Sequence, residues 1–445
     1  MKQKMNQKVE RGIALFLALV LAFTGMSSEL VSAATASAKT MKLNTYQGKV
    51  TVQNAKGSSK KTTKGMRLLK GDKVATAAKS NAYIELDSTK AVKMDENTKV
   101  QLFQSGKDLE LVAQSGNLFF NVKKPLGAKE SFRVRSSTLI AGVRGTSAFL
   151  TVEKNKTSIF LLEGTLKVSK IASNKKETSV GTITGGKVVT LEKKSGKESV
   201  TTKKFTEKDV PYYVLEEIAK DKDLQKKIDK LSTLSSKKLL TIKTYMDQGM
   251  TREGAIEKAT FKGTPVLSKM SIAWDLKKNG TMKVQTLAGG AEGEGTENNL
   301  KFIGVTVEIR NFKELKAPKG RKKVSYELVI LWNELEGGFN GVAQNGNETS
   351  DFCFGVINYP VVDYQTGEYA DKKYGVSYEY QEINENGNLF LKMVIEYPES
   401  YKDLCLLISG ASRPVRQEEM HVPFLKKDFM FSNTDSSFCH GMRIQ

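Results

Sequence analysis

The sequence contains little of what common metal and catalytic sites require. Its 445 residues include only three cysteines and two histidines. His421 and His440 are too few for a histidine-based zinc site, and no cysteine spacing matches a metal-ligand motif. We therefore expect no metal site, no cofactor and no catalytic residues, and we predict that the protein is not an enzyme.

Cysteine is scarce and confined to one half of the chain. Cys353, Cys405 and Cys439 all lie in the C-terminal half. At most one disulfide can form among three thiols, and the sequence does not identify which two pair. None of the three lies near the N-terminus, which excludes a lipoprotein anchor.

Long apolar runs are also absent, apart from one near the N-terminus. Ile13–Phe23 is apolar, follows a basic segment and precedes the small residues Val31-Ser32-Ala33. This order is typical of a secretory signal peptide, which we place at residues 1–33, with Ala38 as a second cleavage position. About 11 apolar residues are short for the roughly 20 of a spanning helix, so we expect no membrane span after cleavage and a secreted, extracellular protein. An uncleaved anchor is the alternative.

The charge is strongly positive and unevenly placed. The chain holds 70 Lys and Arg against 49 Asp and Glu, a net charge of +21. Residues 1–260 hold 48 of the basic and 25 of the acidic residues, whereas residues 261–445 hold 22 and 24. The basic half predicts contact with anionic cell-wall polymers or surface proteins at the cell envelope. We expect no nucleic-acid partner, because export removes that target and few aromatic residues stand among the lysines. The oligomeric state cannot be predicted.

Short strands dominate the first half. From Thr45 to Leu191, runs such as Ala82–Leu86 and Leu109–Val112 alternate apolar and polar residues, which is typical of strands with one buried face. Glycines precede many of these runs at loosely repeated spacing. We predict a rolled or solenoid-like β domain at residues 40–200, with a sandwich as the alternative.

Several of these segments carry a family resemblance. These segments are Leu69–Thr76, Ser80–Asp87, Gly116–Val122, Phe132–Val134, Val143–Phe149 and Leu162–Val168. In order and spacing they resemble the FecR domain family over residues 45–192, and the Val-Arg-Gly-Thr element is the most specific part. One departure is Asp87-Ser88-Thr89, where the family usually has Asp-Gly-Ser.

The resemblance implies an extracytoplasmic β domain. In iron-uptake signalling, FecR proteins are anti-sigma regulators with a cytoplasmic domain before a membrane span. Only about a dozen residues precede the apolar run here, so we expect no sigma-factor binding.

The remainder divides into a helical and a second β segment. Residues 206–261 predict a helical connector, because Leu215, Ile218 and Leu224 recur at helical spacing. Residues 266–445 predict longer antiparallel strands, including 374–380 and 389–395, in a β-sandwich.

Four other segments invite a chemical interpretation. Ala288–Asn299 carries three glutamates but lacks the order of a calcium loop, so we expect a solvated loop. Lys316–Lys323 is interpreted as a solvated hairpin loop. Val143–Ser147 is interpreted as a glycine turn with a structural arginine. Cys439-His440 resembles a catalytic dyad, but adjacent strand residues point to opposite faces.

Aromatic residues in the second half allow an alternative function. Tyr374, Tyr378 and Tyr380, with Trp332 and Tyr369, could stack on a sugar. The preferred hypothesis is a secreted, non-catalytic FecR-domain protein that binds a ligand or acts as a scaffold. The alternative is a carbohydrate-active enzyme or carbohydrate-binding protein that uses the C-terminal sandwich.

Overall fold

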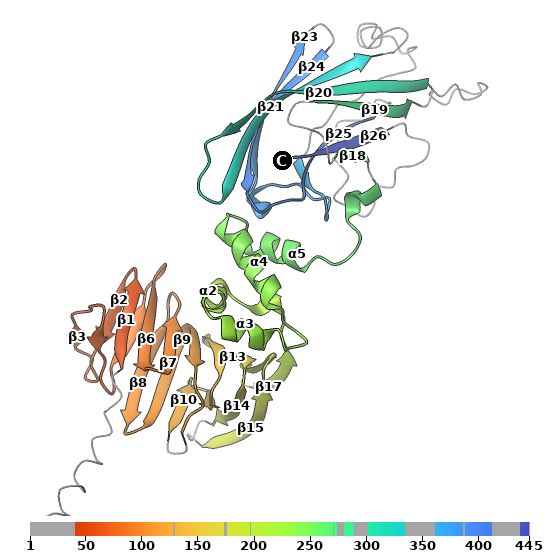
Figure 1. The fold of residues 1–445 in the computed structure, drawn as a ribbon. Coiled ribbons are helices and arrows are strands. Elements are labelled where there is room, and N and C mark those ends of the chain that lie inside the picture. Colours follow the sequence, from red (N-terminus) through yellow and green to blue (C-terminus); the bar gives the residue numbers. More distant parts are fainter. Residues whose placement is uncertain are drawn as a thin grey trace, which may run out of the picture. The chain divides into compact units, whose positions relative to one another are not determined.

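The chain is mainly β, as expected, and the described residues of the computed structural model include four α-helices near the middle of the sequence (Figure 1). The structure describes residues 41–444 except 128–129, 173–175, 196, 270, 274–279, 289–300, 334–360, 386–387 and 412–436. The expected signal peptide therefore lies outside the described residues. None of the described helices has both the length and the apolar character that a bilayer crossing demands.

Two compact units make up the chain. The N-terminal unit comprises Met1–Thr206 and Lys222–Thr233, and the C-terminal unit comprises Glu207–Asp221 and Leu234–Gln445. The chain therefore leaves the first unit, returns to it through one helix and leaves it again.

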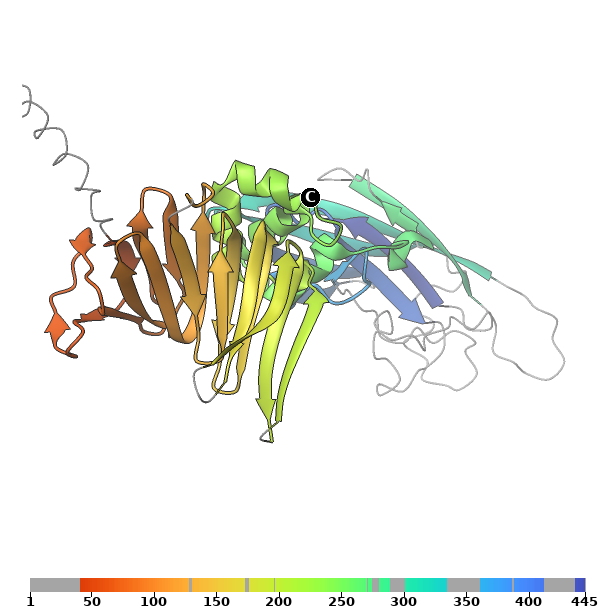
Figure 2. The same cartoon turned by 90° about the horizontal axis from the view of Figure 1, so that it is seen from below.

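Seventeen connected strands build the N-terminal unit, and Figure 2 shows them side by side. Their ladders form two sheets that share one strand, β9 (Asp108–Val122). Sheet A contains, in order, β4 (Met66–Arg67), β1 (Lys42–Gln47), β6 (Asn81–Asp87), β7 (Lys90–Met94), β9, β12 (Ser147–Val152), β13 (Lys156–Glu163), β16 (Lys187–Lys194) and β17 (Lys197–Lys204). Sheet B contains β3 (Ser59–Lys60), β2 (Val50–Gln53), β5 (Lys73–Thr76), β8 (Lys99–Ser105), β9, β10 (Ser131–Arg135), β11 (Leu139–Val143), β14 (Thr165–Ile171) and β15 (Glu177–Thr184).

Strand β9 passes from one sheet to the other. Its first half pairs with β8 and β10 in sheet B, and its second half pairs with β7 and β12 in sheet A. Gly116 stands at the crossing with φ of +90°, a conformation that residues with a Cβ rarely adopt. A Cβ there would lie 2.5 Å from the Cα of Thr98. Glycine at this position therefore permits the bend that joins the two sheets.

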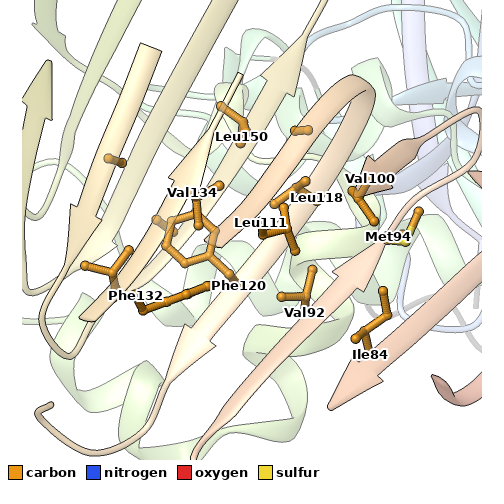
Figure 3. Packing of buried hydrophobic residues seen from close by; sticks show 14 of the residues in the cluster. Ile84, Val92, Met94, Val100, Leu111, Leu118, Phe120, Phe132, Val134 and Leu150 are labelled. Carbon is orange, nitrogen blue, oxygen red and sulfur yellow. The ribbon is translucent and has the colours of Figure 1, made fainter. Parts of the chain in front are cut away.

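One hydrophobic cluster joins the buried faces of both sheets (Figure 3). Ile84 and Val92 come from sheet A, and Val100 and Val134 come from sheet B. The alternation expected from the sequence is present in β6, where every second residue is buried. Burying an aliphatic side chain of this size contributes about 1.5–3 kcal/mol.

The expected helices of residues 206–261 are confirmed. They are α2 (Tyr212–Lys220), α3 (Lys222–Ile228), α4 (Ser236–Asp247) and α5 (Arg252–Thr260). Thr251 caps the start of α5, because its hydroxyl accepts a hydrogen bond from the Gly254 N–H at 3.2 Å. Helix α3 belongs to the N-terminal unit, where Lys227 Nζ lies 2.9 Å from a carboxylate oxygen of Glu163 on β13.

Two sheets form the β part of the C-terminal unit. Asp371 caps a short 3-10 turn, Lys372–Tyr374, so strand β23 begins at Ser377 and not at Tyr374 as expected. The packing of the sheets as a sandwich stays a prediction. The five-stranded sheet contains β19 (Gly280–Ala288), β20 (Lys301–Leu315), β21 (Arg321–Asn333), β24 (Asn388–Pro398) and β23 (Ser377–Glu385), and the four-stranded sheet contains β18 (Ser271–Ala273), β26 (Ser437–Arg443), β25 (Leu404–Ala411) and β22 (Val361–Asp363).

Candidate functional site

The surface of the N-terminal unit is strongly cationic. Among its described residues from 41 to 206, 20 lysines and three arginines are exposed, against six exposed acidic residues. The most one-sided stretch is Met41–Gly71, which holds eight basic residues and no acidic one. We call this stretch the cationic segment. It contains strands β1 to β4 and lies at one end of the strand order in both sheets.

One lysine of the cationic segment has a structural partner. Lys60 Nζ lies 2.6 Å from Oδ2 of Asp72, whose side chain is 1% exposed. The same carboxylate oxygen accepts a hydrogen bond from the Leu69 N–H at 2.8 Å. Asp72 thus holds the loop that follows β4. The other seven basic side chains of the segment are exposed: Lys42, Lys49, Lys56, Lys61, Lys64, Arg67 and Lys70.

The Val143–Ser147 turn is structural. Gly145 has φ of +108°, and a Cβ there would lie 3.2 Å from the Cα of Pro125. The Ser147 hydroxyl is buried and donates to Oδ1 of Asn121 at 3.0 Å. Arg144 is exposed, so the expectation of a structural arginine is wrong. The turn is instead held by Gly145 and by the Ser147 contact.

The Asp87-Ser88-Thr89 turn explains how the chain departs from the usual Asp-Gly-Ser pattern. Asp87 Oδ1 accepts hydrogen bonds from the N–H and the hydroxyl of Thr89, both at 2.8 Å. The buried Lys90 donates to Asp87 Oδ2 at 2.7 Å. Ser88 is not among the residues with positive φ, so this turn does not require glycine.

The proposed sugar-stacking surface is not formed as expected. Tyr374 is fully buried. Its hydroxyl donates to Oε1 of Glu257 at 3.1 Å, because the 3-10 turn directs the ring into the unit and away from the sheet face. Tyr380 is 54% exposed, whereas the side chain of Trp332 lies outside the described part of the chain.

The expected hairpin loop joins β20 to β21, but its single arginine, Arg321, is not solvated. Arg321 Nε donates to Oε1 of Glu396 at 2.6 Å. Its two terminal nitrogens donate to the carbonyl oxygens of Gln248 and Gly375, each at 2.8 Å. Arg321 therefore joins the end of helix α4 to the sheet. The solvated-loop interpretation is wrong for this residue, because the planar guanidinium matches three acceptors that come together only in the fold.

A buried ionic cluster, which sequence reasoning did not predict, attaches helix α5 to the C-terminal sheets. Lys258 Nζ lies 2.7 Å from Asp363 Oδ2 and 2.8 Å from Asp403 Oδ2. The Tyr401 hydroxyl donates to Asp363 Oδ2 at 2.8 Å. Burial and the Asp363 charge raise the pKa of Tyr401 well above its usual value, so its hydroxyl keeps the donated proton. The partners stand far apart in sequence, and no local spacing could have revealed them.

The remaining candidates fall wholly or partly outside the described residues. The acidic loop Ala288–Asn299 does so beyond its first residue, and the side chains of Cys439 and His440 are likewise not described. Within the described ranges, no three His, Cys, Asp or Glu side chains gather in an arrangement that could hold a metal ion.

Comparisons with solved structures give a weak likeness. Two crystal structures of a candidate anti-sigma factor from Parabacteroides distasonis ATCC 8503 are similar to this chain, at 13% and 14% sequence identity, each with a TM-score of 0.25. Each match covers 30% of this chain and 59% of the other, so this chain spans about three fifths of those proteins. A TM-score this low transfers neither a fold nor a role.

Comparison with protein families is more specific. No curated protein matches the sequence. The model of the FecR protein family matches residues 72–167. The match begins directly after the cationic segment and includes the Asp87 turn, the β9 crossing and the Val143–Ser147 turn. Residues 72–167 of this chain are therefore a FecR domain.

Proposed function

We propose that this protein is exported and acts without catalysis, as a binding or scaffold module at the cell envelope whose cationic segment contacts an anionic surface polymer. The observation that carries the proposal is the charge of Met41–Gly71, where seven of eight basic side chains are exposed and no acidic residue occurs. The signal-peptide pattern of residues 1–33 and the extracytoplasmic location implied by the FecR resemblance support export.

Lysine suits contact with a flexible polymer better than recognition of one rigid ligand. Its ammonium group is a mobile point charge, without the fixed two-pronged geometry of arginine. Each lysine near an anionic surface contributes about 1 kcal/mol, and salt screens this attraction over a Debye length of about 10 Å at 0.1 M. Binding through the cationic segment should therefore be cumulative and strongly salt-dependent.

The carbohydrate-based alternative has less support. It relied on a row of exposed aromatic side chains, and Tyr374 is buried with a hydrogen-bonded hydroxyl. The neighbouring carboxylates of Asp363 and Asp403 are both paired with Lys258, which does not favour them as the acid and base of glycoside cleavage.

Sedimentation with purified anionic wall polymer tests the proposal. The chain from residue 34 should sediment with the polymer at about 50 mM salt and be released at about 500 mM. The test variant replaces Lys56, Lys61, Lys64 and Lys70 with glutamine. The matched control replaces Lys154, Lys156, Lys193 and Lys194, which are equally exposed and lie elsewhere in the same unit.

We expect the test variant to bind at least about tenfold more weakly, while the control keeps most of its affinity. Equal losses in the two variants would mean that net charge alone governs adsorption, which contradicts a role for the cationic segment. Absence of sedimentation by the unmodified protein at low salt would also overturn the proposal.

A further inference from the structure

The outer face of sheet B contains a pocket that the function proposed above does not use. Its volume is about 430 Å³. This value lies within the roughly 300–1,000 Å³ typical of small-molecule sites. Residues on β9, β10, β11, β14 and β15 line it, and none belongs to the cationic segment. It is therefore a separate feature of the N-terminal unit.

Much of the pocket lining is apolar. Val112, Ile140 and Ile171 line it and lie outside the hydrophobic cluster between the sheets, whereas Ala113, which also lines it, belongs to that cluster. The register explains their position, because Val112 and Ile140 both pair with Arg135, and alternate strand residues point to opposite faces. The solvent-exposed face of an antiparallel sheet normally carries polar residues. Apolar residues on this face therefore require an explanation.

Four charged side chains stand on the same face, and only one pair among them is close. Arg133 lies 2.6 Å from Glu110. Arg135 Nε is 3.5 Å from Glu110, and Arg133 is 3.5 Å from Glu177. Ordinary N–H···O bonds measure about 2.7–3.2 Å. The Glu110–Arg133 pair thus satisfies its own members, whereas Arg135 and Glu177, which both line the pocket, have only long contacts.

Arg135 and Glu177 present accessible charges to the pocket. The Nε atom of Arg135 is buried, with Glu110 at 3.5 Å, but 39% of the Arg135 side chain is exposed. The Glu177 side chain is 47% exposed. An anionic group in the pocket can therefore bond to the terminal nitrogens of the guanidinium, and a cationic group can pair with Glu177.

The spacing of the two charges limits the length of the ligand. Arg135 is on β10 and Glu177 is on β15, with β11 and β14 between them. Three steps of about 4.8 Å separate their backbones by roughly 14 Å. We propose that this pocket binds a small apolar zwitterion of the size of an aliphatic dipeptide, with its carboxylate on Arg135 and its ammonium group on Glu177.

Titration of the full mature chain with L-leucyl-L-leucine tests this assignment, with two capped analogues as probes of each pole. N-acetyl-leucyl-leucine lacks the ammonium group, and leucyl-leucinamide lacks the carboxylate. We expect measurable binding of the free dipeptide and at least about tenfold weaker binding of each capped form, which corresponds to about 1.4 kcal/mol per pole.

Two variants that each remove one charge test which residue binds the carboxylate of the dipeptide and which binds its ammonium group. Arg135→Gln should bind the free dipeptide and its amide equally, and Glu177→Gln should bind the free and the acetylated dipeptide equally. Arg144→Gln and Glu153→Gln remove exposed charges of the same signs outside the pocket and should bind like the unmodified chain. Circular dichroism confirms that each variant is folded.

Several results would overturn the assignment. No heat or chemical-shift change with about 10 mM dipeptide would mean that the pocket does not take this ligand. Equal binding of all three dipeptides by the unmodified chain would mean that its charges do not recognise the termini. Because the cationic segment is intact in every variant, sedimentation with wall polymer reports separately on the proposed function.

Discussion

Lys258 on α5 and Asp363 on β22 form a buried ion pair, with 2.7 Å between Nζ and Oδ2 and side chains that are 1% and 0% exposed. The ring of Tyr401 lies 5.3 Å from the same Nζ, and Asp403 supplies a second carboxylate. Helix α5 is therefore fixed to the β strands of its unit by charge in addition to apolar contact.

Asp363→Asn should destabilise the C-terminal unit by about 3–5 kcal/mol, because it removes one partner of a buried pair and weakens the compensation of Lys258. Both tryptophans, Trp274 and Trp332, lie in this half of the chain, so tryptophan fluorescence during urea unfolding reports on this unit alone. Glu379→Gln is the control, since Glu379 lies in the same unit and is exposed, and it should change stability by less than about 0.5 kcal/mol. A similar small change for Asp363→Asn would contradict the importance of the pair.

Arg321→Gln should destabilise the same unit by about 2 kcal/mol, because it breaks the ion pair with Glu396 and the bonds to two backbone carbonyls. Lys319→Gln, in the same loop, should leave the fluorescence-detected unfolding midpoint unchanged. Arg321→Lys should recover only part of the loss, since an ammonium group cannot reproduce the planar arrangement of donors. Full recovery by lysine would show that charge, and not geometry, is what matters here.

Gly116→Ala should destabilise the N-terminal unit by more than about 3 kcal/mol. The positive φ alone costs an L-residue about 1–2 kcal/mol, and the added Cβ would also meet the Thr98 backbone at 2.5 Å. Gly106→Ala isolates the first effect, because Gly106 has φ of +56° and nothing within 4 Å of an added Cβ. Far-UV circular dichroism, compared with tryptophan fluorescence, separates this unit from the other. Equal effects of the two substitutions would disprove the close approach at the β9 crossing.

Asp95→Asn should stabilise the N-terminal unit at neutral pH. Burial raises the pKa of Asp95 above its usual value, against the lowering by hydrogen bonds from the Glu96 backbone and the Asn117 side chain. The folded state therefore holds the proton more tightly than the unfolded state. The ionised Asp95 carboxylate consequently lowers the free energy of unfolding. This loss of stability is fully present above the folded pKa and absent below the unfolded pKa of about 3.9.

The gain from Asp95→Asn should consequently shrink as the pH falls from 7 to below 4, as measured by urea unfolding with circular dichroism at several pH values. Glu153→Gln removes an exposed carboxylate from the same unit and should give no such trend. A gain that is independent of pH would mean that the asparagine acts through something other than the charge of Asp95.

Sequence patterns correctly predicted the secondary structure that depends on residues close together in the chain. Alternation in Ala82–Leu86 indicated a strand with one buried face, and the spacing of Leu215 and Ile218 indicated a helix. Long-range contacts could not be predicted in this way. Tyr374 continues the pattern of a strand, yet the cap from Asp371 turns it into the interior. Lys258 and Arg321 resemble other basic residues until partners more than 50 positions away surround them.

Strand register also narrows the choice of disulfide among the three cysteines. Cys405 pairs with Arg443, and Cys439 pairs with Ser409, on the antiparallel strands β25 and β26. The two cysteines are therefore four residues apart along the ladder, or about 14 Å, whereas a disulfide needs Cα atoms within about 7 Å. We expect peptide mapping without reductant to find no link between Cys405 and Cys439, so that any intramolecular disulfide includes Cys353. The variant Cys353→Ser should then show two titratable thiols after oxidation and denaturation, and a linked peptide containing Cys405 and Cys439 would show that the β25–β26 register is wrong.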